Sequence, residues 1–110
     1  MIVEDDPFIA MDLEDTFLDC GYSVTGPFAE VTSALDSLET LLPDIAILDY
    51  NLGQGTTIPL AQNLHEKKIP FIFLSGQIKT VIIGHDIPKR PIVTKPFVPK
   101  KLIKMIDNLI

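Results

Sequence analysis

Residues 45–50 read Ile-Ala-Ile-Leu-Asp-Tyr, an apolar run closed by the single carboxylate of Asp49. Four consecutive apolar residues bounded by polar ones are typical of a strand that is buried on both faces of a parallel sheet. An acid at the end of such a strand costs free energy unless another group compensates its charge. The stretch therefore predicts the centre of the fold and also the position of a polar site.

Three other apolar runs also end in polar groups. They are Ile2–Val3 followed by Glu4, Asp5 and Asp6, Phe71–Leu74 followed by Ser75, and Ile92–Thr94 followed by Lys95. The carboxyl ends of parallel strands meet at one edge of a sheet, where α/β proteins bind their ligands. We therefore expect these groups to form one site with Asp49.

Strand-like and helix-like segments alternate along the chain. We predict strands at 2–3, 22–25, 44–48, 69–74 and 92–94, and helices from Pro7 to about Gly21, over 31–42, after a polar loop at 51–57, and from Pro99 onward. Between Gly76 and Pro91, β-branched residues, Gly84 and two prolines predict a short or irregular fourth helix. This alternation favours an α/β fold, a doubly wound sheet of five parallel strands with helices on both faces.

The composition indicates one globular domain over residues 1–110, with no output domain. The chain is 46% hydrophobic and 22% charged, with a formal net charge of −6, and its first basic residue is Lys67. The basic residues are mixed with acids and prolines, so nucleic-acid binding is not expected. No apolar stretch approaches the roughly 20 residues of a membrane helix. Without a signal peptide, and with Cys20 as the single cysteine, a soluble, cytoplasmic protein is expected.

The polar strand ends suit a metal and a phosphoryl group. Clustered carboxylates repel one another unless a cation compensates them, and oxygen ligands without His or Cys suit Mg²⁺. With the metal bound, the Ser75 hydroxyl and the Lys95 ammonium are groups that can hold phosphoryl oxygens. Asp49 would then be the acceptor.

Four motifs in order resemble the receiver domain of two-component response regulators. They are Val3-Glu4-Asp5-Asp6, Leu48-Asp49, Leu74-Ser75-Gly76 and Thr94-Lys95-Pro96-Phe97. The resemblance covers nearly the whole chain and implies a flavodoxin-like strand order of 2-1-3-4-5. Proline-rich residues 76–91 further resemble a stand-alone alphaproteobacterial subset with an atypical fourth helix, although Gln77 and Ile78 stand where that subset has tyrosine.

The resemblance also implies roles for individual residues. Asp49 would be phosphorylated, Ser75 would be the switch hydroxyl, and Lys95 would contact the phosphate and be joined to Pro96 by a bond that is often cis in the family. Mg²⁺ would be held by Asp5, Asp49 and the backbone carbonyl of Asn51, with Glu4 acting through water. The family's aromatic switch position is Ile92 here, so aromatic coupling is absent in its usual form.

The implied function is that of a signalling phosphoacceptor rather than an enzyme. The donor would be a histidine kinase or a histidine phosphotransfer protein, and phosphorylation would switch residues 76–91 and the last helix for a downstream protein partner. A dimer, if one forms, would use the 76–110 face.

Three alternatives remain open from the sequence. A pseudo-receiver would bind partners without phosphorylation, although it would typically lose the acceptor, an acid or the lysine. A receiver cut from a hybrid kinase or a longer regulator would share the chemistry. A haloacid-dehalogenase-type phosphatase would need a second acid at position 51, which is Asn, and room for a cap.

Overall fold

The computed structural model describes residues 1–52, 55–76 and 92–109. A parallel sheet of four strands runs through it in the order β1-β2-β5-β6. The strands are β1 (Ile2–Val3), β2 (Ala46–Asp49), β5 (Phe71–Ser75) and β6 (Ile92–Thr94). β2, the predicted central strand, is buried at every position and pairs with β1 on one side and β5 on the other.

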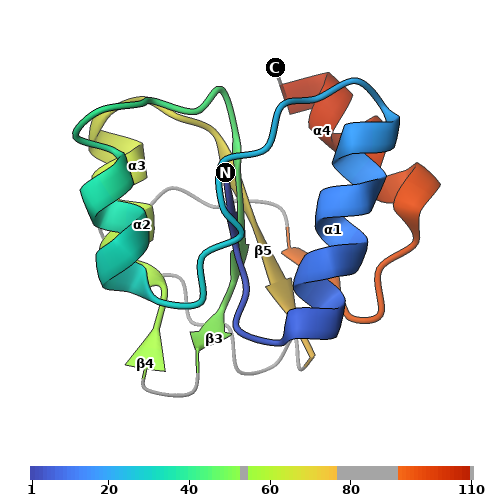
Figure 1. Ribbon diagram of the computed structural model, residues 1–110, viewed down its shortest axis with the longest axis horizontal. Helices are drawn as coiled ribbons and strands as arrows, with labels where there is room; N and C mark the ends of the chain where they lie inside the picture. Colours follow the sequence, from blue (N-terminus) through green and yellow to red (C-terminus); the bar gives the residue numbers. More distant parts are fainter. Residues whose placement is uncertain (53–54, 77–91, 110) are drawn as a thin grey trace.

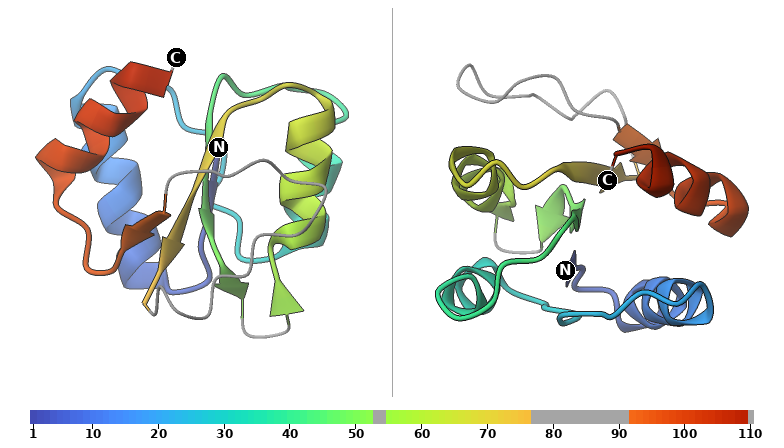
Figure 2. Two further views of the ribbon diagram at one scale, coloured as in Figure 1. Left: turned by 180° about the vertical axis from the view of Figure 1, so that it is seen from behind. Right: turned by 90° about the horizontal axis from the view of Figure 1, so that it is seen from above.

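Among the described residues, four helices cover the two faces of this sheet, so the predicted doubly wound α/β fold is confirmed. They are α1 (Pro7–Asp19), α2 (Val31–Ser37), α3 (Ile58–Glu66) and α4 (Pro99–Leu109). Figures 1 and 2 show α2 and α3 on one face of the sheet and α1 and α4 on the other. None of the helices in the described ranges is both long enough and apolar enough to cross a bilayer.

Each face of the sheet has its own hydrophobic core. Leu48, Leu60 and Leu64 belong to the core beneath α2 and α3. Leu13 and Ile106 belong to the core beneath α1 and α4, together with side chains from the opposite face of the same strands. Alternate residues of a strand point to opposite faces, so each apolar run contributes to both cores.

The predicted strand at Tyr22–Thr25 is not present, so within the described ranges the sheet has four strands instead of the predicted five. The Ile2 N–H donates to the Thr25 carbonyl and the Phe28 N–H donates to the Ile2 carbonyl, but pairing is limited to one isolated bridge between Val3 and Phe28. Between those contacts Gly26 has a φ of +100° and the Gly26–Pro27 peptide bond is cis. Proline has no N–H to donate to a ladder, and a positive φ leaves the strand conformation, so continuous pairing ends there.

The end of the second helix also differs from the prediction. The second helix ends at Ser37 rather than Leu42, since the Leu38, Glu39 and Thr40 N–H groups donate to carbonyls three residues back and tighten the chain into turns. Leu41 and Leu42, the last apolar residues of the predicted helix, lie beyond the end of α2 and are 57% and 58% exposed.

The predicted loop at 51–57 contains two short antiparallel strands, β3 (Asn51–Leu52) and β4 (Gly55–Thr56). They lie beyond the carboxyl end of β2 (Figure 1). The predicted irregular fourth helix falls almost wholly on residues 77–91, outside the described ranges.

Candidate functional site

The register of the sheet brings the four polar strand ends to one edge. Val3 pairs with Leu48, so Glu4 and Asp49 follow paired residues on neighbouring strands. Ser75 is the last residue of β5 and pairs with Thr94, the residue before Lys95. The sequence prediction that these groups share one edge is therefore correct for all four.

Lys95 links the acids of two strands. Its ammonium Nζ lies 2.7 Å from Glu4 Oε1 and 3.1 Å from Asp49 Oδ1. Glu4 is only 2% exposed and Asp49 only 4%. A buried carboxylate is tolerated when a cation and hydrogen bonds compensate its lost hydration, and here one cation serves two carboxylates.

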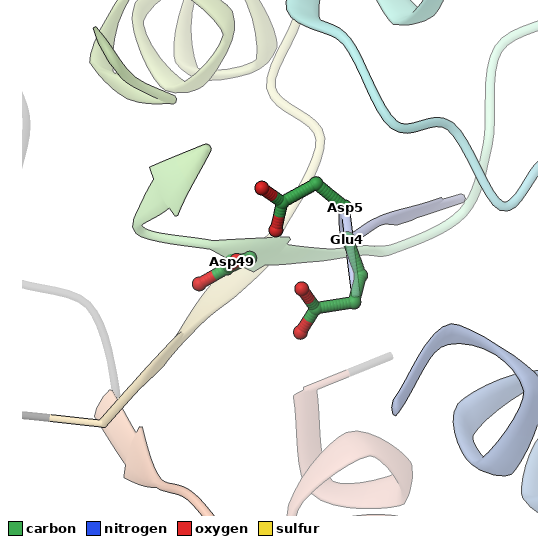
Figure 3. A group of neighbouring side chains, drawn as sticks. All are labelled: Glu4, Asp5 and Asp49. Carbon is green, nitrogen blue, oxygen red and sulfur yellow. The ribbon is translucent and has the colours of Figure 1, made fainter. Parts of the chain in front are cut away.

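Asp5 completes an acidic cluster that opens to solvent. Figure 3 shows the carboxylates of Glu4, Asp5 and Asp49 around a common space. One oxygen of each lies within 4.8 Å of the other two. Asp5 is exposed, whereas the other two are buried. All three donors are carboxylate oxygens, which suit a hard divalent cation such as Mg²⁺. The residues present thus fit that metal.

The pKa of Asp49 reflects both its burial and the negative charge beside it. Burial is the largest cause that raises this pKa, and a hydrogen bond to Glu4 and the Glu4 charge raise it further. Lys95 opposes them, and the net result is a pKa of about 7. Burial lowers the pKa of Lys95, but its bonds to Glu4 and Asp49 outweigh that effect and leave the Lys95 pKa raised. One ammonium therefore does not balance the carboxylates around it, and a further cation would stabilise the cluster.

A backbone hydrogen bond joins Ser75 at the end of β5 to Lys95, which follows β6. Ser75 is 2% exposed, and its carbonyl accepts a hydrogen bond of 2.9 Å from the Lys95 N–H. The Lys95–Pro96 peptide bond is cis, as the family resemblance implied. Ile92, at the family's aromatic switch position, is half-buried and packs against the core beneath α2 and α3.

Asn51 lies two residues beyond Asp49, at the start of β3, where it pairs with Thr56. The predicted metal contact of its carbonyl remains a prediction.

Asp6 has a defined position that the site prediction did not include. Its carboxylate accepts hydrogen bonds from the Phe8 and Ile9 N–H groups and so caps α1. The signal was present in the sequence, because an Asp directly before a Pro is typical of a helix start.

The structure is thus that of an α/β protein with a doubly wound sheet, and the strand ends at one edge of this sheet carry an acidic cluster, a hydroxyl and a lysine. The chain belongs to the response regulator receiver domain family, whose model matches residues 1–107. This confirms the resemblance found in the sequence and favours a receiver over the phosphatase alternative.

Individual relatives agree with the family match. The chain is 29% identical over 98% of its length to the phyllosphere-induced regulator PhyR of Methylorubrum extorquens, of which it covers 42%. It is 25% identical over 99% of its length to the chemotaxis protein CheY of Thermotoga maritima, of which it covers 94%. The chain spans only about half the length of several other curated relatives that it matches.

Among solved structures, SdrG from Sphingomonas melonis Fr1 is similar, with a TM-score of 0.82 and 36% identity over 98% of this chain and 92% of SdrG. The atypical fourth helix of the resembled subset concerns residues outside the described ranges and stays a prediction.

Proposed function

We propose that this receiver accepts a phosphoryl group on Asp49 from a phosphohistidine of a histidine kinase or histidine phosphotransfer protein. The observation that carries the proposal is the position of the Lys95 ammonium between Glu4 and Asp49, with the Asp5 carboxylate beside them. An acceptor carboxylate, a fixed cation and an open acidic cluster are the parts that such a transfer needs.

In the proposed reaction a carboxylate oxygen of Asp49 attacks phosphorus and the phosphorus–nitrogen bond of the donor breaks. The donor imidazole keeps the electron pair of that bond and takes up a proton, and Asp49 becomes an acyl phosphate. Lys95 already contacts Asp49 through Oδ1, so its ammonium is positioned to offset charge on the transferred group. Mg²⁺, held by Asp5 and Asp49 with the Asn51 carbonyl and with Glu4 through water, would neutralise further phosphoryl charge.

Ser75 is proposed to convert phosphorylation into a change of shape. Its hydroxyl would hydrogen-bond the new phosphate and draw the chain that follows β5 toward the site. Two arrangements of that segment, biased by one local charge, would form a switch. The proposed outputs are residues 76–91 and α4.

The proposed output helix carries a basic surface. Lys100, Lys101 and Lys104 are exposed on α4, and their spacing of three and four residues places Lys104 beside each of the other two. An acidic surface on a downstream protein would complement them. The 110 residues would then act as one receiver unit in the cytoplasm and signal through protein contact.

Intact-mass analysis after incubation with acetyl phosphate tests the acceptor. With Mg²⁺ we expect one phosphoryl adduct on the wild type and on Asp15→Asn, which removes an exposed acid of α1. Asp49→Asn should carry none, and omission of Mg²⁺ should abolish the wild-type adduct. A folded wild type that takes up no phosphoryl group from acetyl phosphate or from a phosphohistidine donor would support the pseudo-receiver alternative.

A further inference from the structure

The three consecutive acids that follow β1 take three different positions. Glu4 is buried against Lys95, whereas Asp5 and Asp6 are exposed. Asp5 joins the acidic cluster with Glu4 and Asp49, and Asp6 is not part of it. Glu4 therefore contacts the Lys95 ammonium, and Asp5 faces the candidate metal position. Asp6 instead accepts hydrogen bonds from backbone N–H groups.

The Asp6 side chain fixes the start of α1. Its Oδ1 atom lies 2.9 Å from the Phe8 nitrogen and 3.3 Å from the Ile9 nitrogen, and its own backbone is extended, with φ −76° and ψ 115°. Pro7 follows at the first helical position, where its fixed φ suits the helix. These are the features of a side-chain N-cap, which satisfies N–H groups that the helix itself leaves unpaired.

The Asp6 backbone at the same time holds the site. Its N–H donates to Glu4 Oε2 over 3.1 Å, while Lys95 lies against the other oxygen, Glu4 Oε1. The Glu4 carboxylate is thus fixed from two sides. Because the peptide plane of Asp6 includes the carbonyl of Asp5, a change in the orientation of that plane would move the Asp5 backbone as well.

We propose that Asp6 is a positioning residue for the metal site. By capping α1, its carboxylate locks the turn between β1 and α1, so that its N–H orients Glu4 and its backbone places the Asp5 carboxylate beside Asp49. The part of this inference that concerns Mg²⁺ binding rests on the proposed function. The cap of α1 and the hydrogen bond from the Asp6 N–H to Glu4 are features of the metal-free protein. Groups that orient metal ligands in this way typically change metal affinity by about 10-fold to 100-fold when they are lost.

Three variants separate positioning from charge. Asp6→Ala removes both the cap and the negative charge, Asp6→Asn keeps an oxygen that can cap but removes the charge, and Asp15→Ala removes an exposed negative charge elsewhere on α1. Mg²⁺ titration followed by calorimetry should give a Kd about tenfold higher for Asp6→Ala. Asp6→Asn and Asp15→Ala should stay within about twofold of the wild type.

Amide hydrogen exchange of the metal-free protein supplies a readout that is independent of phosphorylation. The Ile9 N–H, which Asp6 caps, should exchange faster in Asp6→Ala and at the wild-type rate in Asp6→Asn. Faster exchange with unchanged Mg²⁺ affinity would overturn the inference, because the cap would then serve the helix alone. Equal loss of affinity in Asp6→Asn and Asp6→Ala would also overturn it, because charge would then be the cause.

The same titration distinguishes the two proposals. A wild type that takes up phosphoryl groups and binds Mg²⁺ equally well with Asp6→Ala would refute the positioning of Asp6 and leave the acceptor function intact. A wild type that binds no Mg²⁺ and forms no adduct would refute the proposed function, and with it the part of this inference that concerns Mg²⁺ binding.

Discussion

Asp49 is expected to lower the stability of the metal-free protein at neutral pH, and Asp49→Asn should restore it. Asp49 is 4% exposed, and its carboxylate lies beside that of the buried Glu4. Asn has nearly the same shape and offers Lys95 the same kind of acceptor atom, but it carries no charge. The variant therefore removes the repulsion and the desolvation of a charge while it leaves the packing in place.

The sign and the size of this stability difference follow from the pKa of Asp49. Its pKa is about 7 in the folded protein against 3.8 for an ordinary Asp, so between these values the folded state binds more protons than the unfolded chain. Its contribution to the free energy of unfolding is then largest below pH 3.8 and is lost as the pH rises toward 7. Between about pH 5 and pH 8 the stability advantage of Asp49→Asn should grow by roughly 2 to 3 kcal/mol.

Urea unfolding in the presence of a chelator, followed by circular dichroism, measures this difference directly. Acids that do not interact with Asp49 also titrate over this range, but their effects cancel when the two proteins are compared at each pH. Asp15→Asn, an exposed acid of α1, should show a difference from wild type that changes little with pH. Added Mg²⁺ should stabilise the wild type more than Asp49→Asn, because binding to the folded state adds to its stability.

A difference between Asp49→Asn and wild type that stays constant from acid to neutral pH would refute the reasoning. It would mean that Lys95 already compensates the charge of the buried Asp49, and that a further cation would not stabilise the acidic cluster.

Five other substitutions test the ion pair, the packing and a close approach of the backbone, each by urea unfolding. Lys95→Met should lower the free energy of unfolding by about 3 kcal/mol, since it leaves a buried carboxylate without its cation, whereas a loss below about 1 kcal/mol would mean that water replaces the ammonium. Leu64→Ala should lower the free energy of unfolding by about 2 to 5 kcal/mol because Leu64 is fully buried. Leu41→Ala should lower it by less than about 1 kcal/mol because Leu41 is 57% exposed. Equal losses in the two variants would contradict the early end of α2. Gly26→Ala should cost more than Gly21→Ala: both glycines have a positive φ, but only at Gly26 would a new Cβ lie 2.8 Å from a carbonyl oxygen of β1.

The position of the site could be predicted from the sequence because it depends on topology more than on detail. Alternating strands and helices force a parallel sheet, and a parallel sheet gathers its carboxyl ends at one edge. Glu4, Asp49, Ser75 and Lys95 each follow or close an apolar run, so their meeting needed no knowledge of distances. The role of Asp6 was less accessible, since three adjacent acids look alike until the turn that separates them is known.

The fold details that differed depend on contacts between distant segments. Tyr22–Thr25 has a strand-like composition, yet a strand exists only where a neighbour pairs continuously with it, and Gly26 and Pro27 interrupt that pairing. Leu41 and Leu42 continue a helical spacing, but the helix is already replaced by turns at Leu38. Local pattern indicates which structure a segment prefers, and tertiary packing decides where that structure stops.

The ion pair between Glu4 and Lys95 joins residues from nearly opposite ends of the sequence. During synthesis the ribosome releases the acids that follow β1 and close β2 long before β6 and Lys95, so a growing chain holds those acids without their counter-ion. The site is therefore among the last features of this domain that a nascent copy can complete, after much of the domain's apolar interior is available to collapse. Under the proposed function, a nascent chain would become able to accept a phosphoryl group only once β6 has been made.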